Sequence, residues 1–72
     1  MELDSKSKKE IGKRFRKARE QQKLTQAEIA KESGISTGYY ARIERGEEQP
    51  SLTTIKILVK TLKVKAGDVL PF

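Results

Sequence analysis

The side chains most often used for catalysis and metal binding are missing from this 72-residue chain, which has no histidine and no cysteine. Histidine is the commonest general base and metal ligand, and cysteine supplies zinc ligands and disulfides. The neighbouring carboxylates Glu47 and Glu48 have no nucleophile beside them, and neighbours in a loop point apart. The residue types therefore argue against an enzyme, and they predict no cofactor, no metal and no small-molecule ligand.

The main chemical feature of the remaining side chains is their positive charge. Sixteen Lys and Arg residues stand against ten Asp and Glu, which gives a net charge of +6. Such a balance favours an anionic partner, either a nucleic acid, an acidic protein or a phospholipid surface. The longest uninterrupted apolar string is Ile57-Leu58-Val59, so neither a signal peptide nor a membrane span is predicted. We expect a cytoplasmic binding domain.

The first element that must position these charges is an amphipathic helix over about residues 7–22. Ile11, Phe15 and Ala18 recur at helical spacing, with Lys and Arg on the other faces. Residues 1–6 offer only Leu3 for burial and are expected to form a flexible N-terminal arm. The sequence thus predicts one domain over residues 7–72.

A second and a third helix are predicted on either side of a glycine turn. Thr25 and Glu28 form the pattern of a capping box that begins a helix over 26–33. Gly34 follows, and glycine is the residue best suited to the left-handed conformation that ends a helix. Ser36 can then cap a helix over 37–45.

The helix over 37–45 is predicted to have a packed side and an open side. At 100° per residue, Tyr40 and Ile43 lie close together, and Gly38, Arg42 and Arg45 point the opposite way. A helix, a glycine turn and a second helix with an exposed polar face form a DNA-binding arrangement when the assembly is basic.

Two further helices complete the predicted fold. Ser51 can cap a fourth helix, and a short last helix is expected over 64–70, before Pro71. The fourth helix carries the widest apolar stripe: Leu52, Ile55, Leu58, Val59 and Leu62. No useful length of sequence alternates with period two, so the fold class is all-α.

Four stretches of the chain resemble one family when they are taken in order. They are Leu24-Thr25-Gln26-Ala27-Glu28-Ile29-Ala30, Ser33-Gly34-Ile35-Ser36, Arg42-Ile43-Glu44-Arg45-Gly46 and Pro50-Ser51-Leu52. This pattern resembles the Cro and phage-repressor type of helix-turn-helix regulator, the XRE family, over about residues 8–70. The resemblance implies a compact five-helix, lambda-repressor-like domain that binds double-stranded DNA to regulate transcription.

The resemblance also implies which side chains would meet base edges in the major groove. The matching positions are Thr37, Gly38, Tyr39 and Arg42. An arginine can donate to both N7 and O6 of a guanine. For Arg42 the alternative is a solvated ion pair with a carboxylate, and for Tyr39 it is a packing role. Thr37 and Gly38 are short, so direct reading should be sparse, with DNA shape contributing.

Contacts to the DNA backbone and one internal ion pair follow from the same resemblance. Gln26 matches a glutamine that binds a phosphate, and Arg45, Gln49 and Ser51 are weaker phosphate candidates. Glu47 and Glu48 argue against a strong contact from their loop. Arg19 and Glu44 match a pair that joins the first helix to the third in a partly buried salt bridge.

The remaining apolar residues suggest self-association. Ile57, Val69, Leu70 and Phe72 are expected at the interface of a homodimer that binds a partly palindromic operator. A repressor or autoregulator is the predicted function. Two alternatives stay open: an antitoxin-like or partner-recruiting protein module, and a membrane-surface role for the first helix, which its narrow apolar face disfavours.

Overall fold

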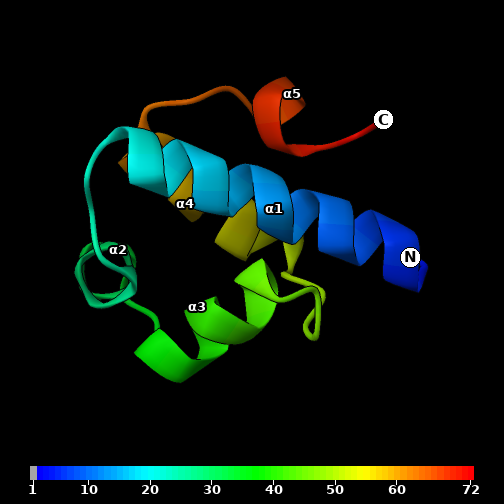
Figure 1. Cartoon of the computed structure of the whole chain (residues 1–72), viewed down its shortest axis with the longest axis horizontal. Helices are drawn as coiled ribbons and strands as arrows, with labels where there is room; N and C mark the ends of the chain where they lie inside the picture. The colour runs from blue at the N-terminus through cyan, green and yellow to red at the C-terminus, as the bar shows by residue number, and fades with distance from the viewer. Residues whose placement is uncertain (1) are drawn as a thin grey trace.

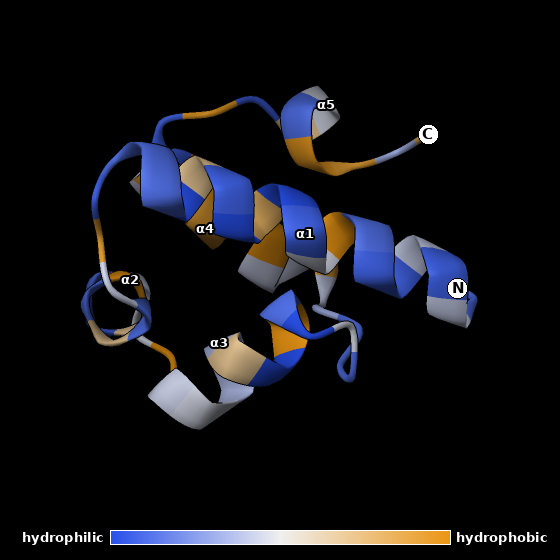
Figure 2. Ribbon diagram, in the orientation of Figure 1, coloured by the Kyte–Doolittle hydropathy of each residue, from blue (hydrophilic) through white to orange (hydrophobic). Residues whose placement is uncertain are grey.

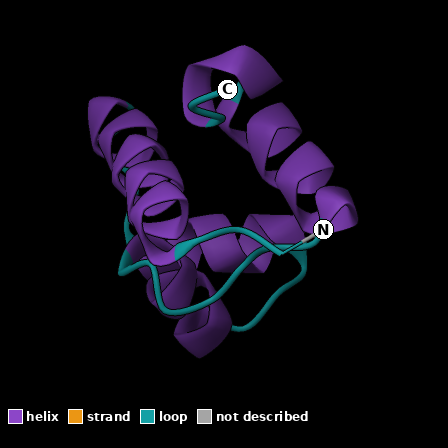
Figure 3. Cartoon of the chain, turned by 90° about the vertical axis from the view of Figure 1, so that its right-hand side faces the viewer, coloured by secondary structure: helices purple, strands orange, loops and turns teal. Residues whose placement is uncertain are grey.

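Five helices connected by short loops make up the protein in a computed structural model, which describes residues 2–72 (Figure 1). They are α1 Ser5–Gln21, α2 Gln26–Ser33, α3 Thr37–Glu44, α4 Leu52–Leu62 and α5 Ala66–Val69. The described residues include no strand, and the all-α prediction is confirmed. Helix α1 lies across the molecule between α3 and α5, and α2 packs against α3 and α4 (Figures 1 and 3).

Helix α1 begins at Ser5, two residues before the predicted start. Asp4 explains the difference, because its carboxylate accepts a hydrogen bond of 2.7 Å from the backbone N–H of Ser7 and so caps the helix. Leu3 packs against the core. Of the predicted arm over residues 1–6, Met1 lies outside the described residues, Asp4 caps α1, and Ser5 and Lys6 belong to its first turn with exposed side chains.

Local capping signals set the helix-turn-helix as predicted. The Thr25 hydroxyl accepts from the backbone N–H of Glu28, at 3.0 Å, and the Glu28 carboxylate accepts from the backbone N–H of Thr25, at 2.8 Å. Gly34 ends α2 with φ +72°, in the left-handed region that favours glycine. The turn that sets α3 against α2 is therefore encoded by residues within the turn itself.

The core joins all five helices. Its fully enclosed side chains are Ile11, Phe15, Ile29, Tyr40, Ile43, Leu58, Leu62 and Val69. Leu52 was expected in the same stripe but is 72% exposed, because it is the first residue of α4 and lies at the end of the helix beyond the core. Figure 2 shows the apolar sides of α1, α3 and α4 facing the interior.

Helices α1 and α3 are in close contact at Gly12. A Cβ atom at this position would overlap the backbone carbonyl groups of Ile43 and Glu44. The periodicity of α1 does not reveal this contact, because a glycine on a helix face is also compatible with an open surface. Because Gly12 has no side chain, the C-terminal end of α3 can lie directly against the backbone of α1.

Helix α5 is shorter than the predicted 64–70 and is followed by an extended C-terminus. Its last residue, Val69, is buried against the core. In the described part of the chain, every helix falls short of the length and apolar character that a membrane span requires.

Candidate nucleic-acid interface

Helix α3 has one packed side and one open side. The Ser36 hydroxyl caps it by accepting from the backbone N–H of Tyr39, at 3.1 Å, while Tyr40 and Ile43 are fully buried. Thr37, Gly38 and Arg42 are exposed. Tyr39 is half-buried and packs against the core, so part of its ring has the packing role that the sequence left open. Figure 2 shows the pale, weakly polar first turn of α3 at the outer edge of the molecule.

Arg42 forms an ion pair on this open side. Its Nε atom donates to Oε2 of Glu48 at 3.3 Å, and the two side chains are 45% and 40% exposed. This is the solvated pair that was considered as the alternative to groove contact. Exposed pairs of this kind contribute only about 0–1 kcal/mol, so the guanidinium remains available to an external acceptor.

A network of polar side chains connects Glu44, the last residue of α3, to α1 and α2. Arg19 donates to Glu44 through Nε, at 2.7 Å, and through Nη2, at 3.1 Å. Its Nη1 atom donates to the carbonyl of Leu24 at 2.8 Å. Gln26 donates from Nε2 to Oε1 of Glu44 at 3.0 Å. The network therefore links the start of α2 to the end of α3 through one carboxylate.

Hydrogen bonds keep the Arg19–Glu44 pair of this network charged although it is largely buried. Burial opposes the charge on Glu44, but the hydrogen bonds from Arg19 and Gln26 outweigh that effect, and the pKa of Glu44 lies below its ordinary value. The hydrogen bonds to Glu44 raise the pKa of Arg19. Burial, reinforced by Glu44, raises the pKa of the Tyr40 hydroxyl. At neutral pH the pair is charged, and Tyr40 is neutral.

A basic hollow of about 360 Å³ lies beside this network. It is lined by Arg16, Arg19, Gln26, Glu44 and Arg45. Arg45 is paired in the loop, where Glu47 accepts from its Nε at 2.8 Å and from its Nη2 at 3.1 Å. Arg16 is one of the basic residues that the sequence places on the polar faces of the first helix. Its place in this hollow depends on how α1 packs in the folded domain, which no local sequence signal indicates.

Two residues that were predicted to contact phosphate, Gln49 and Ser51, form hydrogen bonds with other residues of this chain. The Oε1 atom of Gln49 accepts a 2.6 Å hydrogen bond from the backbone N–H of Leu3 and so holds the N-terminal segment. The hydroxyl of Ser51 donates to Thr54 Oγ1 at 2.9 Å and accepts from its backbone N–H at 3.1 Å. Ser51 thus caps α4, and Gln49 holds the N-terminal segment through its amide oxygen.

The residues expected at a dimer interface do not form one surface. Val69 is only 1% exposed because α5 turns its side chain into the core, so the expectation was wrong for this residue. Phe72 is 72% exposed and lies with Leu52 and Leu70 around an apolar hollow of about 430 Å³. Ile57 is 38% exposed on α4 and does not line that hollow.

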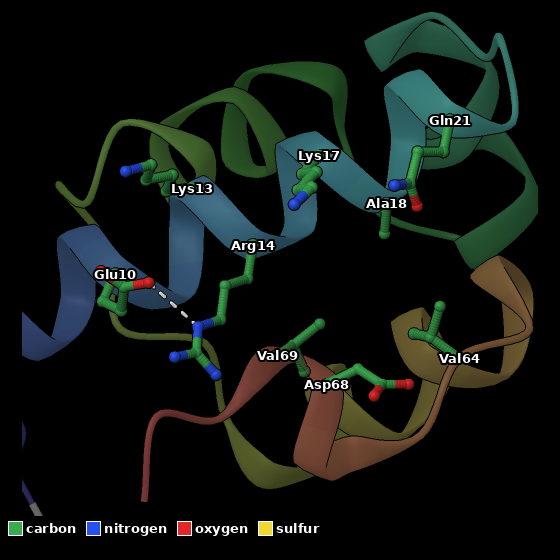
Figure 4. Close-up of a pocket in the computed structure, with 9 residues that line it drawn as sticks. All are labelled: Glu10, Lys13, Arg14, Lys17, Ala18, Gln21, Val64, Asp68 and Val69. Atoms are coloured by element: carbon green, nitrogen blue, oxygen red, sulfur yellow. Dashed lines mark hydrogen bonds and ion pairs between the residues drawn. The ribbon is translucent and has the colours of Figure 1, made fainter.

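Another hollow, of about 570 Å³, separates α1 from α5 (Figure 4). Its rim includes Lys13, Arg14 and Lys17, and Arg14 is held by Glu10 at 2.9 Å. Figure 1 places α5 and α3 on opposite sides of α1, so this hollow faces away from the open side of α3. Among the described residues, no cluster of three carboxylate, imidazole or thiol side chains could hold a metal ion.

Sequence comparison identifies relatives with the same arrangement. A helix-turn-helix family model, HTH_3, matches residues 15–69. The immunity repressor protein of Bacillus phage phi105 is 32% identical over 59 residues, which cover 82% of this chain and 41% of the repressor. The HTH-type transcriptional regulator y4dJ of Sinorhizobium fredii (strain NBRC 101917 / NGR234) is 35% identical over 54 residues, 75% of this chain and 70% of that protein. The chain thus spans less than half the length of the phage repressor.

Comparison with solved structures also identifies helix-turn-helix regulators. The restriction-modification controller protein C.AhdI from Aeromonas hydrophila superposes with a TM-score of 0.83 at 29% identity, over 86% of this chain and 94% of that one. The resemblance inferred from the four stretches is confirmed. The chain belongs to the HTH_3 helix-turn-helix family, whose members are DNA-binding transcription regulators.

Proposed function

We propose that this protein is a sequence-specific DNA-binding regulator whose α3 enters the major groove. The observation that carries the proposal is the two-sided character of α3. Tyr40 and Ile43 bury one side completely, while Thr37, Gly38 and Arg42 are free of the core on the other. An exposed helix that a rigid scaffold holds at the surface is the usual reading element of helix-turn-helix proteins.

In this proposal Arg42 donates to a guanine, and Thr37 contacts a neighbouring base, such as the methyl group of a thymine. Gly38 has no side chain, which permits close approach of the helix backbone. Tyr39 would touch the groove wall with the part of its ring that is not packed. With so few direct contacts, the shape and deformability of the duplex contribute to selectivity.

Gln26 and Arg45 are proposed to bind backbone phosphate. Both line the basic hollow at the start of α2, together with Arg16. The backbone N–H groups at a helix N-terminus add to the attraction for an anion. Because Gln26 is bonded to Glu44, a phosphate held there would also orient the end of α3.

The functional unit is proposed to be a homodimer on a partly palindromic operator, with half-sites about 34 Å apart. Phe72, Leu70 and the exposed Leu52 surround an apolar hollow that a second copy would cover. Such a dimer would act in the cytoplasm as a repressor or autoregulator by competing with polymerase. The similarity to the immunity repressor of phage phi105, with which 82% of this chain aligns over 41% of the repressor's length, supports the repressor role.

Selection of bound sequences from a random duplex pool tests the proposal. We expect an enriched motif with two related half-sites and an affinity that falls steeply with salt, because phosphate neutralisation releases counterions. A scrambled duplex of equal length is the control for charge alone. Equal binding to selected and scrambled duplexes at every salt concentration would contradict sequence-specific recognition.

A further inference from the structure

We infer that Glu48 is a positioning residue for Arg42, which it holds by Nε so that the two terminal nitrogens face the DNA. The inference rests on the proposed function, because it assigns a role to a residue beside the proposed reading helix. Glu48 lies outside α3, in the loop that leads to α4. On sequence alone its charge only counted against a DNA contact from that loop.

The geometry of the guanidinium carries the argument. Oε2 of Glu48 accepts from Nε of Arg42 at 3.3 Å. No described residue accepts a hydrogen bond from Nη1 or Nη2 of Arg42. A guanine edge offers two acceptors, N7 and O6, and a guanidinium meets them with two parallel N–H groups. The contact with Glu48 therefore leaves a bidentate edge open.

The space over Gly38 is a second, independent observation. A Cβ atom at Gly38 would lie 3.6 Å from Nη1 of Arg42, so the guanidinium extends back along α3 over this residue. That distance is an ordinary van der Waals contact, so only a side chain that extends beyond Cβ would compete for the same volume. Glu48 holds Nε of Arg42, and the missing side chain of Gly38 leaves room for the guanidinium beside the first turn of α3.

The backbone keeps Glu48 in place. Gly46 adopts φ +74°, and the N–H of Glu47 then donates to the carbonyl of Arg42 at 2.9 Å. The loop therefore folds back onto the last turn of α3. Glu47 pairs with Arg45 rather than with Arg42, so the two neighbouring carboxylates serve different arginines.

A positioned arginine should distinguish bases better than a free one, because less side-chain freedom is lost on binding the correct base. Removal of Glu48 also removes a negative charge near the phosphates, which would strengthen binding to every sequence. The two effects are separable, since only the first changes the ratio of affinities for two duplexes that differ at one base pair.

The experiment measures Kd for the selected operator and for the same duplex with the Arg42-dependent guanine replaced by adenine, at one salt concentration. We expect Glu48→Ala to lower the discrimination ratio at least threefold and Glu48→Gln, which keeps an acceptor oxygen, to lower it less. Glu47→Ala is the matched control: it removes the same charge from the same loop and should tighten both duplexes equally, leaving the ratio unchanged. Melting curves that match the parent protein show that each variant is folded.

Arg42→Ala and the double variant Arg42→Ala/Glu48→Ala, together with Glu48→Ala and the parent protein, form a double-mutant cycle. The ratio should be the same in these two proteins if Glu48 acts through Arg42. Identical ratios in Glu48→Ala and the parent, or a further loss in the double variant, would overturn the positioning role. If the parent itself shows no preference for the selected operator, the proposed function fails; if it discriminates through Arg42 and Glu48→Ala preserves the ratio, only this inference fails.

Discussion

Arg19 of α1 and Glu44 of α3 are joined by two hydrogen bonds, of 2.7 and 3.1 Å, in a pair whose side chains are only 12% and 3% exposed. Glu44 also accepts from Gln26 at the start of α2. One carboxylate therefore fixes three helices relative to one another. Its loss should affect the stability of the domain before it affects the choice of base.

Replacement of Glu44 by alanine should lower the free energy of unfolding by about 3–5 kcal/mol, because it leaves a largely buried guanidinium without its partner. At about 4–8 °C per kcal/mol, the melting temperature should fall by more than 10 °C. Thermal unfolding followed by circular dichroism measures the change. The control is Glu20→Ala, which removes one partner of the exposed Arg16–Glu20 pair and should cost less than about 1 kcal/mol. Similar melting temperatures for both variants would contradict the anchoring role.

The same carboxylate predicts a pH dependence of stability. The pKa of Glu44 is lower in the folded protein than its ordinary value of 4.5, so the unfolded state binds the proton more readily. The contribution of Glu44 is therefore complete above pH 4.5 and is lost as the pH falls through the folded pKa. The difference in unfolding free energy between the parent and Glu44→Gln should shrink from pH 7 to pH 3. Denaturant titrations that give a constant difference over this range would contradict it.

Gly12→Ala should destabilise the domain by roughly 1–3 kcal/mol or more, because a Cβ atom would overlap backbone atoms of α3 that cannot rotate away. Gly67→Ala is the control. No heavy atom lies within 4 Å of its added Cβ, and alanine in a helix should be neutral or stabilising by up to about 1 kcal/mol. Chemical denaturation measures both. A harmless Gly12→Ala would mean that α1 and α3 can separate without cost.

Some features of this fold are encoded by residues close together in the sequence, and others depend on how the helices pack. The capping box at Thr25 and Glu28 and the left-handed Gly34 are encoded within a few residues, and the sequence predicted both. The contact at Gly12, the exposure of Leu52 and the burial of Val69 depend on how whole helices pack. The periodicity of one helix shows an apolar side but not where that side ends against its neighbours.

The candidate site divides in the same way. The open side of α3 follows from the spacing of its apolar residues, and it was predicted. The pairing of Glu48 with Arg42 depends on a loop that turns back at Gly46, and the place of Arg16 in one hollow with Gln26 depends on how α1 packs in the folded domain. Helical spacing carries no information on either contact.

Arg42→Ala and Gln26→Ala should change DNA binding in different ways. Arg42→Ala should cost about 1–3 kcal/mol of discrimination at one base step, because a bidentate contact to guanine is lost. Gln26→Ala should weaken binding to all sequences alike, since a phosphate carries no sequence information. Titration of the selected operator and its single-base variants separates the two. Loss of affinity without any change of preference in both variants would show that the roles are wrongly assigned.

Self-association should depend on the apolar hollow near the C-terminus. Phe72→Ser and Leu52→Ser should each raise the dimer dissociation constant by at least tenfold, because both exposed side chains border that hollow. Sedimentation equilibrium over a range of concentrations measures this constant. Ile57→Ser is the control, since Ile57 is exposed elsewhere on α4 and should have little effect. A parent protein that stays monomeric at high micromolar concentration would contradict the homodimer.

The separation of α3 into a buried side and an open side has an evolutionary consequence. Tyr40, Ile43 and Glu44 hold the helix in place, whereas Thr37, Gly38 and Arg42 take no part in the core. Mutations at the second set can therefore accumulate and be tested by selection without a folding penalty. A duplicated copy of the gene could acquire a new target within a few substitutions while keeping its ancestral scaffold.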